Sequence, residues 1–276
     1  MSLLLRTFPI VIILLLLPLS AGAQLEKKKK FKNFRKASLS SPYVAVIDAS
    51  SGELLFGKNE NEKKPIASIT KIVGAYVYLN ENPNLKRKVK LESGDEVGGG
   101  RLKLPIGTSA KAKDFLYSSL IGSANNSATA LIRLSGLGKN EFTRKMEELA
   151  SQAGASTANF VDSSGISPQN QASAKDLALI GKKVLENKTI CDIGGKKKYS
   201  FKINDGKGTK SIVHTSSIVN AKNKTFDVLF AKTGYPPEDG NNLIATLANR
   251  QKRQTDVIVV VMGAKNQTGT ASDVIK

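Results

Sequence analysis

Three short motifs supply side chains that could carry out acyl transfer. Ser-x-x-Lys occurs once in the chain, at Ser68 and Lys71, Ser-x-Asn once, at Ser123 and Asn125, and Lys-Thr-Gly once, beginning at Lys232. A serine hydroxyl is a weak nucleophile at neutral pH, and a lysine can act as its base only when the lysine pKa is lowered. The three motifs, in this order, predict a serine nucleophile with a lysine base.

A helix must hold the first motif in place. Apolar residues recur at helical spacing after Ser68, so we predict a helix over 68–79. Residues three positions apart lie on one helical face, which lets the Lys71 amine reach the Ser68 hydroxyl. Lys232 falls on a predicted strand, and it could be the second cation that lowers the pKa of Lys71.

The remaining periodicities define the frame around the motifs. Strand patterns come early and late in the chain, and helical patterns lie between them. We predict strands at 43–48, 53–56, 199–203, 226–234, 242–248 and 255–263, and helices at 68–79, 110–121, 127–134, 139–153 and 174–186. This order favours an α/β (α+β) three-layer sandwich, in which an antiparallel sheet carries an inserted helical subdomain. The glycine-rich stretch 89–108 lacks the lysine of a P-loop, so we expect a flexible loop there.

Longer stretches around the motifs carry a family likeness. They include PIASITKI at the serine, FLYSSLIGSANNSA at Ser-x-Asn, and KTGYPPEDGNNLIATLA at the late strands. From about Tyr43 to about Gly263, the sequence resembles the penicillin-binding DD-peptidases, the D-alanyl-D-alanine carboxypeptidases and endopeptidases that trim bacterial peptidoglycan. The resemblance implies a β-lactamase/DD-peptidase-like fold and an enzyme without a cofactor or metal.

The resemblance also implies the roles of the catalytic residues. Ser68 would attack the carbonyl between two D-alanines, and Lys71 would accept its proton. Ser123 would relay a proton to the leaving amine. Asn125 would hold the amide of the substrate.

Four further residues are implied to bind the substrate. Lys232 would supply positive potential, and Thr233 would hydrogen-bond a terminal carboxylate. Gly234 would let the substrate backbone lie close to the strand. The N–H of Tyr235 would complete an oxyanion hole with the N–H of Ser68.

The function expected from the resemblance is a serine-type D-alanyl-D-alanine carboxypeptidase that acts on peptidoglycan stem peptides, with β-lactam antibiotics as covalent inhibitors. A DD-endopeptidase that cleaves cross-links is an alternative, because the arginine that often holds the terminal carboxylate is not evident and only Lys265 stands near its place. An inert, basic wall-binding homologue is another. The chain ends shortly after the last expected strand, where relatives usually continue with a helix, and neither a second β domain nor a membrane anchor is expected.

A class A-like β-lactamase is the remaining alternative. Such enzymes use a glutamate to activate the deacylating water. No glutamate occurs between Glu148 and Glu186, and Asp162 is the only acidic residue before Asp176 in that stretch. We therefore expect a β-lactam to acylate the protein and remain attached.

The N-terminal stretch has the pattern of an export signal. Arg6 precedes an apolar run that two prolines interrupt, and Ala21-Gly22-Ala23 follows as a cleavage pattern. We predict a signal peptide at 1–23, a basic linker at 24–41 and a DD-peptidase catalytic domain at 42–276. The expected location is the periplasm or the outer face of the bacterial cytoplasmic membrane and cell wall.

Charge and rare residues restrict the possible partners. The formal net charge is +19, so the surface should attract polyanions, and Lys27 to Lys36 could contact an anionic membrane or wall polymer. No nucleic-acid-binding motif occurs, so no nucleic acid is expected as a partner. The single cysteine, Cys191, excludes an intramolecular disulfide. His214 is also alone, and without a Gly-x-Ser-x-Gly elbow it does not indicate a Ser-His-Asp triad.

Overall fold

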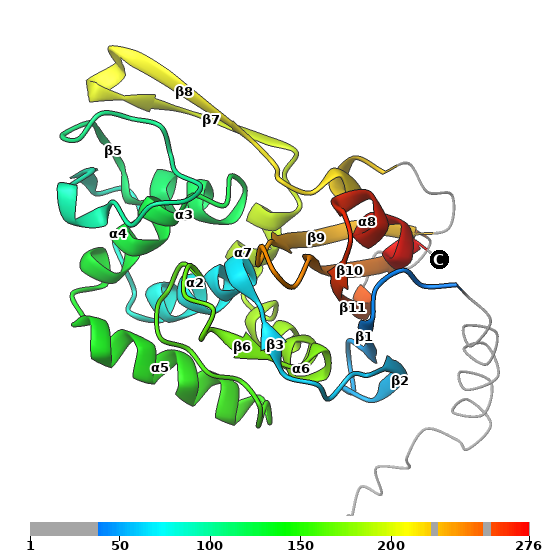
Figure 1. Cartoon of the computed structure of the whole chain (residues 1–276). Coiled ribbons are helices and arrows are strands. Elements are labelled where there is room, and N and C mark those ends of the chain that lie inside the picture. The colour runs from blue at the N-terminus through cyan, green and yellow to red at the C-terminus, as the bar shows by residue number, and fades with distance from the viewer. Residues whose placement is uncertain (1–37, 222–225, 251–254, 276) are drawn as a thin grey trace, which may run out of the picture. The chain divides into compact units, whose positions relative to one another are not determined.

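The computed structural model describes residues 38–221, 226–250 and 255–275 (Figure 1). The chain divides into two units, Met1–Lys36 and Ala37–Lys276, and the described residues belong to the second. The predicted signal peptide and the lysines from Lys27 to Lys36 lie outside the described residues. Within the part of the chain that is described, no helix has the length and apolar character needed to cross a membrane.

A five-stranded antiparallel sheet forms the frame, in the order β2-β1-β11-β10-β9. Its strands are β1 (Tyr43–Asp48), β2 (Leu54–Lys58), β9 (Phe226–Gly234), β10 (Asn241–Asn249) and β11 (Thr255–Ala264). Along β11, Ile258 and Val260 join one hydrophobic cluster, whereas Val259 and Val261 join another. Both faces of the sheet are therefore buried, which explains the nearly continuous apolar sequence of this strand.

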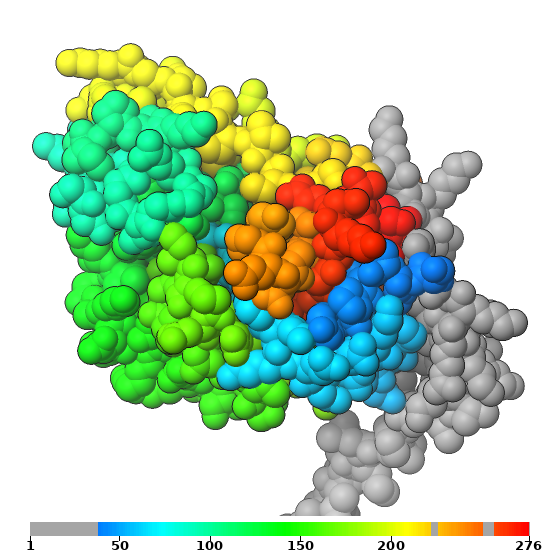
Figure 2. All heavy atoms as spheres, in the orientation of Figure 1, coloured from blue at the N-terminus to red at the C-terminus, as the bar shows by residue number. Residues whose placement is uncertain are grey.

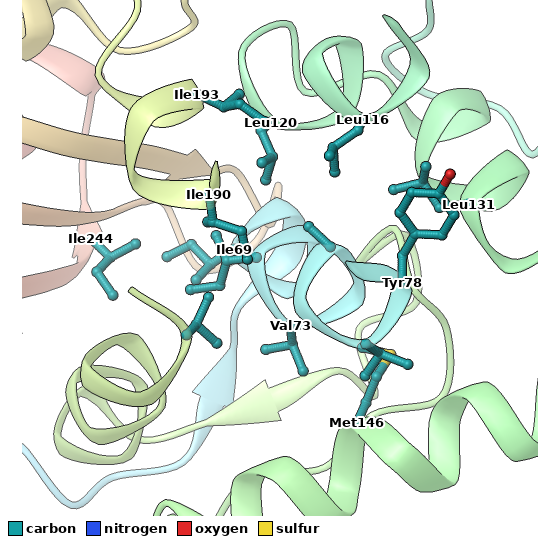
Figure 3. Close-up of a cluster of buried hydrophobic side chains, with 14 of the residues drawn as sticks. Ile69, Val73, Tyr78, Leu116, Leu120, Leu131, Met146, Ile190, Ile193 and Ile244 are labelled. Atoms are coloured by element: carbon teal, nitrogen blue, oxygen red, sulfur yellow. The ribbon is translucent and has the colours of Figure 1, made fainter. Parts of the chain in front are cut away.

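Helices occupy the chain between β2 and β9. They are α2 (Thr70–Asn80), α3 (Ala112–Leu120), α4 (Asn125–Ser135), α5 (Lys139–Gln152), α6 (Ala174–Val184) and α7 (Lys188–Gly194). Figure 3 shows α2 at the centre of this part, with Val73 and Tyr78 directed toward side chains from the surrounding helices, such as Leu131 and Met146. Most of α2 is buried, including its whole first turn, and this fixes the position of the residues attached to that turn.

Helix α8 (Gln267–Ile275) covers the opposite face of the sheet. It packs against β10 and β11, while α6 packs against β1 and β11 from the helical side. The result is three layers, with the sheet in the middle (Figure 1). The expected fold class, a mixed α/β sandwich with an inserted helical part, is confirmed.

Smaller elements connect these layers. Short antiparallel pairs join β3 (Lys64–Pro65) to β6 (Gln171–Ala172), β4 (Lys88–Lys90) to β5 (Ser109–Lys111), and β7 (Lys198–Ile203) to β8 (Gly208–Val213). The 3-10 helices among the described residues are η2 (Ala67–Ile69), η3 (Ser93–Asp95), η4 (Asn204–Gly206) and η5 (Ser217–Asn220).

Two expectations about local structure need correction. Ser68 was expected in the first turn of an α-helix, but it lies in η2, and α2 begins two residues later. The expectation that no helix follows the last strand is wrong, because α8 occupies 267–275. Its sequence, QTGTASDVI, has a glycine and few apolar residues, so its helical periodicity is weak.

Asp273 of α8 hydrogen-bonds to the segment that precedes β1. Its carboxylate accepts hydrogen bonds from the Ser40 backbone N–H at 3.2 Å, the Ser40 hydroxyl at 2.9 Å and the Ser41 N–H at 2.7 Å. Burial opposes ionisation of this carboxyl, but the hydrogen bonds outweigh it and lower its pKa.

We predict that Asp273→Asn destabilises the folded protein by about 1–3 kcal/mol at neutral pH, because a charged acceptor of several hydrogen bonds is lost. A lowered folded pKa means that this stabilisation is present above the unfolded value and is lost as the pH falls through the folded value. Urea unfolding at pH 7 and pH 3 measures the difference. Asp192→Asn, which removes only an exposed pair with Lys188, is the control and should change stability little. Equal stability of Asp273→Asn and the wild type at pH 7 would contradict the prediction.

Candidate active site

A cleft of about 630 Å³ opens between the edge of the sheet and the helical part. In Figure 2 the surface is hollowed between the segment 162–170 and the turn 235–240. Residues of all three motifs line it, namely Ser68, Ser123, Asn125, Thr233 and Gly234, and Tyr235 lines it as well. Lys71 and Lys232 lie beneath this lining, and both are almost fully buried. The eight residues predicted from the sequence are thus together in one place.

The Ser68–Lys71 pair has the geometry of a nucleophile and its base. Lys71 Nζ lies 2.7 Å from Ser68 Oγ. The amine also lies 2.7 Å from Asn125 Oδ1 and donates to the Ser164 carbonyl. Because η2 runs directly into α2, the two side chains remain on one face although Ser68 is in a 3-10 turn.

Burial makes Lys71 suitable as a base at neutral pH. Its side chain is only 1% exposed. Burial lowers the pKa of the Lys71 amine to about 7, while the charge of Asp162 acts in the opposite direction. A substantial fraction of Lys71 is therefore neutral near pH 7 and able to accept a proton from Ser68.

The expected cause of the lowered Lys71 pKa needs refinement. The sequence suggested Lys232 as a second cation, but desolvation is the dominant cause. The pKa of Lys232 is itself held well below its ordinary value, first by burial and then by the charge on Lys71. Protonation of one amine therefore disfavours protonation of the other.

Ser123 forms a second pair with Lys232. Lys232 Nζ lies 2.7 Å from Ser123 Oγ and 2.9 Å from the Thr233 carbonyl. Ser123 has φ of +55°, in the left-handed region that few residues other than glycine adopt. Holding a serine there costs on the order of 1–3 kcal/mol. This strained turn directs the hydroxyl between the cleft and the buried amine.

Thr233 lies at the lip of the cleft, next to a residue that the sequence did not single out. Thr215 Oγ1 lies 2.7 Å from Thr233 Oγ1, and Thr215 also lines the cleft. His214 is buried beside it, with Nδ1 accepting from the Ser216 N–H and Nε2 donating to the Ala231 carbonyl. Burial and the Lys232 charge lower the His214 pKa to about 4, so the ring is neutral and anchors this segment to β9.

The structure explains the glycine at position 234 differently from the sequence analysis. A Cβ at this position would lie 2.4 Å from the Ile66 carbonyl oxygen. The glycine therefore lets β9 approach η2, rather than only making room for a substrate. Tyr235 follows directly and is 59% exposed at the rim of the cleft. Its expected part in an oxyanion hole remains a prediction.

Asn125 has protein partners on both ends of its amide. Its Oδ1 accepts from Lys71, and its Nδ2 lies 3.0 Å from the Gly98 carbonyl. The segment expected to be a flexible loop thus forms a wall of the cleft through Gly99 and Gly100. Asn125 positions Lys71 in addition to the substrate-binding role that the resemblance implies.

Asp162 entered the sequence analysis only in the β-lactamase comparison, and the structure gives it a different role. Its Oδ1 accepts from the Ser164 N–H, the Ser164 hydroxyl and the Gly165 N–H at 2.7–2.8 Å. Its Oδ2 accepts from the Ser167 N–H at 3.0 Å and from Asn170 Nδ2 at 2.6 Å. Burial opposes ionisation of Asp162, but these bonds outweigh it and lower the pKa. The closed network holds the Ser164 carbonyl on Lys71 and leaves Asp162 poorly placed to activate water.

No metal site is evident in the parts of the chain that the structure covers, since no group of three or more His, Cys, Asp or Glu side chains could hold an ion there. Cys191 is half-buried, and burial raises the pKa of its thiol. What the cleft does bring together is two serines, Ser68 and Ser123, each beside a buried lysine amine.

A serine nucleophile beside a buried lysine, on a three-layer α/β sandwich, defines a class of serine hydrolases. Residues 30–266 match the family described as D-alanyl-D-alanine carboxypeptidase. The chain is 33% identical over 220 residues to a D-alanyl-D-alanine endopeptidase of Haemophilus influenzae, covering 79% of this chain and 74% of that protein. It therefore belongs to the D-alanyl-D-alanine carboxypeptidase family and is a serine peptidase. The expected resemblance is confirmed.

Two further proteins are similar to this chain. A D-alanyl-D-alanine carboxypeptidase of Bacillus subtilis is 26% identical, over 100% of this chain and 70% of its own length. A penicillin-binding protein of Listeria monocytogenes, solved in its ampicillin-bound form, has the same fold, with a TM-score of 0.74. It is 24% identical and covers 87% of this chain and 96% of its own.

We predict that Asp162→Asn slows acylation of Ser68 by roughly 10- to 100-fold, because a small displacement of a catalytic group is costly. The pH dependence should also change. Wild-type acylation by a β-lactam should rise as the pH passes through about 7, where Lys71 loses its proton. Asp162→Asn should move this midpoint to lower pH, because the negative charge that favours protonated Lys71 is gone.

Stopped-flow acylation between pH 5 and pH 9 measures both effects. Asp192→Asn, an exposed carboxyl paired with Lys188, should leave rate and midpoint unchanged. A slower variant with the wild-type midpoint would show that Asp162 does not act on Lys71 electrostatically.

Proposed function

We propose that this chain hydrolyses the D-alanyl-D-alanine bond of peptidoglycan stem peptides through an acyl-enzyme on Ser68. The observation that carries the proposal is the buried Lys71 amine, 2.7 Å from Ser68 Oγ at the floor of an open cleft. Membership in the carboxypeptidase family supports the choice of substrate.

Acylation follows from the two serine–lysine pairs. Neutral Lys71 takes the proton of Ser68 while Oγ attacks the scissile carbonyl carbon. The carbon–nitrogen bond then breaks, and Ser123 passes a proton to the leaving amine, replenished from Lys232. Peptide N–H groups at Ser68 and Tyr235 would stabilise the oxyanion, each worth ~10²–10³ in rate.

Hydrolysis of the ester reverses these proton movements. Water enters where the amine left and gives its proton to Ser123 and Lys232. The new hydroxyl attacks the ester carbon, and Lys71 returns its proton to Ser68 Oγ as the shortened stem leaves. A β-lactam would form the same ester and persist, because the carboxylate of Asp162 is occupied by its own loop. Covalent inhibition by β-lactams is supported by the ampicillin-bound relative.

The domain boundaries and the location belong to the same proposal. Residues 1–23 would direct export, 24–41 would link, and 42–276 would be the catalytic domain. A peptidoglycan substrate requires that the catalytic domain lie outside the cytoplasmic membrane. Lys27 to Lys36 would hold it near an anionic membrane or wall polymer.

Cleavage of cross-links is the second candidate function, and the rim of the cleft favours it. Among the described residues, the charged side chains that line the cleft are Glu238 and Asp239, and no lysine or arginine lines it. Lys265 is not part of the lining, whereas Gln267 is. A free terminal carboxylate is repelled by this rim, while a cross-linked substrate need not place a carboxylate there.

The first test is covalent labelling with fluorescent penicillin, followed by digestion of purified muropeptides. The wild type should give a stable labelled band, and Ser68→Ala should give none. Release of D-alanine from pentapeptides indicates the carboxypeptidase, and conversion of dimers to monomers indicates the endopeptidase. An unlabelled wild type that also leaves both substrates intact would refute the proposed function.

The second test changes the rim. Glu238→Gln/Asp239→Asn should raise kcat/KM for release of terminal D-alanine roughly three- to tenfold, from Coulomb energies of ~1 kcal/mol per close charge in water. Cleavage of dimers should change less. Glu141→Gln/Glu147→Gln on α5, which removes the same charge far from the cleft, is the matched control. If both double variants behave alike, the rim does not select the substrate.

A further inference from the structure

We propose that the outer face of the β7–β8 hairpin is a secondary binding site for the anionic peptidoglycan polymer that presents the substrate. The inference rests on the proposed function, which makes peptidoglycan the substrate. The ligand of this face is the part of the peptidoglycan that lies outside the cleft. That polymer is anionic because its stem peptides carry carboxylates. The outward residues of the hairpin do not line the catalytic cleft.

The outer face of the hairpin is exposed and built from amines and hydroxyls. Three cross-strand pairs form it, namely Lys198 with Val213, Ser200 with Ser211, and Lys202 with Thr209. The two serine hydroxyl oxygens are 2.7 Å apart, and Lys202 Nζ lies 3.0 Å from Thr209 Oγ1. Lys198 and Lys202 lie four residues apart on one face, about 13 Å along the strand.

The charge of this segment is strongly one-sided. Between 196 and 210 there are six lysines and one acidic residue, Asp205. Asp205 is paired with Lys88 of β4, so it does not neutralise the lysines of the hairpin. Lys210 donates to the Lys103 carbonyl at 3.0 Å, which brings the basic segment 101–103 beside the hairpin. Such a surface attracts a polyanion rather than another basic surface.

The inner face fixes the hairpin to the protein. The Tyr199 ring lies 4.1 Å from that of Tyr117 and 5.7 Å from that of Phe201, measured between centroids. The Tyr199 hydroxyl donates to Asp114 at 2.7 Å, and Ile212 is buried. A preorganised surface loses less conformational entropy on binding than a flexible one.

The hairpin is directly connected to the catalytic cleft. Thr215 comes two residues after the end of β8 and lines the cleft. Its N–H donates to the Ile121 carbonyl at 3.1 Å. Gly122, also in the lining, faces Ile212 of β8. Figure 1 shows the hairpin extending from this region past α3 and β5. A polymer bound along it would lead toward Ser68.

The chemistry of the face favours peptidoglycan over a lipid surface. A segment that inserts into a membrane interface presents a broad apolar face. Here Val213 is the one apolar member of the six outward residues. Alternating amines and hydroxyls suit carboxylates, amides and sugar hydroxyls instead.

The test compares Lys198→Glu/Lys202→Glu with Lys63→Glu/Lys139→Glu in the full chain. Both control lysines are exposed. Lys63 directly precedes β3 and Lys139 begins α5, and Figure 1 shows both elements away from the hairpin. Binding is measured by co-sedimentation with purified, lipid-free and teichoic-acid-free sacculi, and turnover on sacculi is compared with turnover on soluble muropeptides. The hairpin variant should bind sacculi and digest them on the order of tenfold less well at low salt, with an effect that salt screens. Its activity on soluble muropeptides and its labelling by penicillin should remain within about twofold of the wild type, since the cleft is intact.

Equal losses in both double variants, or wild-type binding of the hairpin variant, would overturn the proposal. The proposal would also be overturned if the hairpin variant lost binding to anionic phosphatidylglycerol vesicles but bound sacculi as well as the wild type does. The ligand of the hairpin would then be a lipid. Sedimentation does not depend on catalysis. A wild type that binds sacculi through the hairpin but cleaves neither substrate would refute the proposed function and leave this surface as a wall-binding site.

Discussion

The site depends on keeping one lysine amine buried beside a serine hydroxyl. In water an amine stays protonated near neutral pH, and a protonated Lys71 could not accept the proton of Ser68. Burial shifts this balance, but an unpaired buried amine would be costly. The protein meets both needs by giving Lys71 three hydrogen-bond partners, on Ser68, Asn125 and Ser164. Neutral Lys71 donates to the Asn125 and Ser164 oxygens and accepts from the Ser68 hydroxyl. Each partner comes from a different segment.

The rest of the fold can be understood from this requirement. Helix α2 is surrounded by α3, α4, α5 and α6, so the turn that carries Ser68 is rigid. The edge strand β9 approaches this turn closely because Gly234 has no side chain to obstruct Ile66. Asp162 organises the loop that supplies the third partner. Lys232, buried beside Ser123, adds a second amine whose protonation opposes that of Lys71.

Much of the fold could be predicted because the spacing of apolar residues along the chain indicates which faces of its helices and strands are buried. The apolar stripe of α2 and the continuous apolar run of β11 both reflect what surrounds them. The helix α8 and the strand β8 were missed because their residues are largely polar, so their apolar periodicity is weak. The three motifs identified the reacting side chains, since the spacing of Ser68 and Lys71 is local. Asp162 could not be recognised in the same way, because its role depends on backbone N–H groups rather than on the types of neighbouring side chains. The cause of the low Lys71 pKa was likewise inaccessible, since burial depends on the whole fold.

The most direct test is a measurement of the Lys71 pKa itself. NMR titration of protein labelled with ¹³C at lysine Cε, with the Lys71 signal assigned by comparison with Lys71→Arg, reports the charge on this amine. A pKa of about 7 is the predicted result. A value near the ~10.4 of an exposed lysine would contradict the account, because Lys71 would then remain protonated when Ser68 reacts.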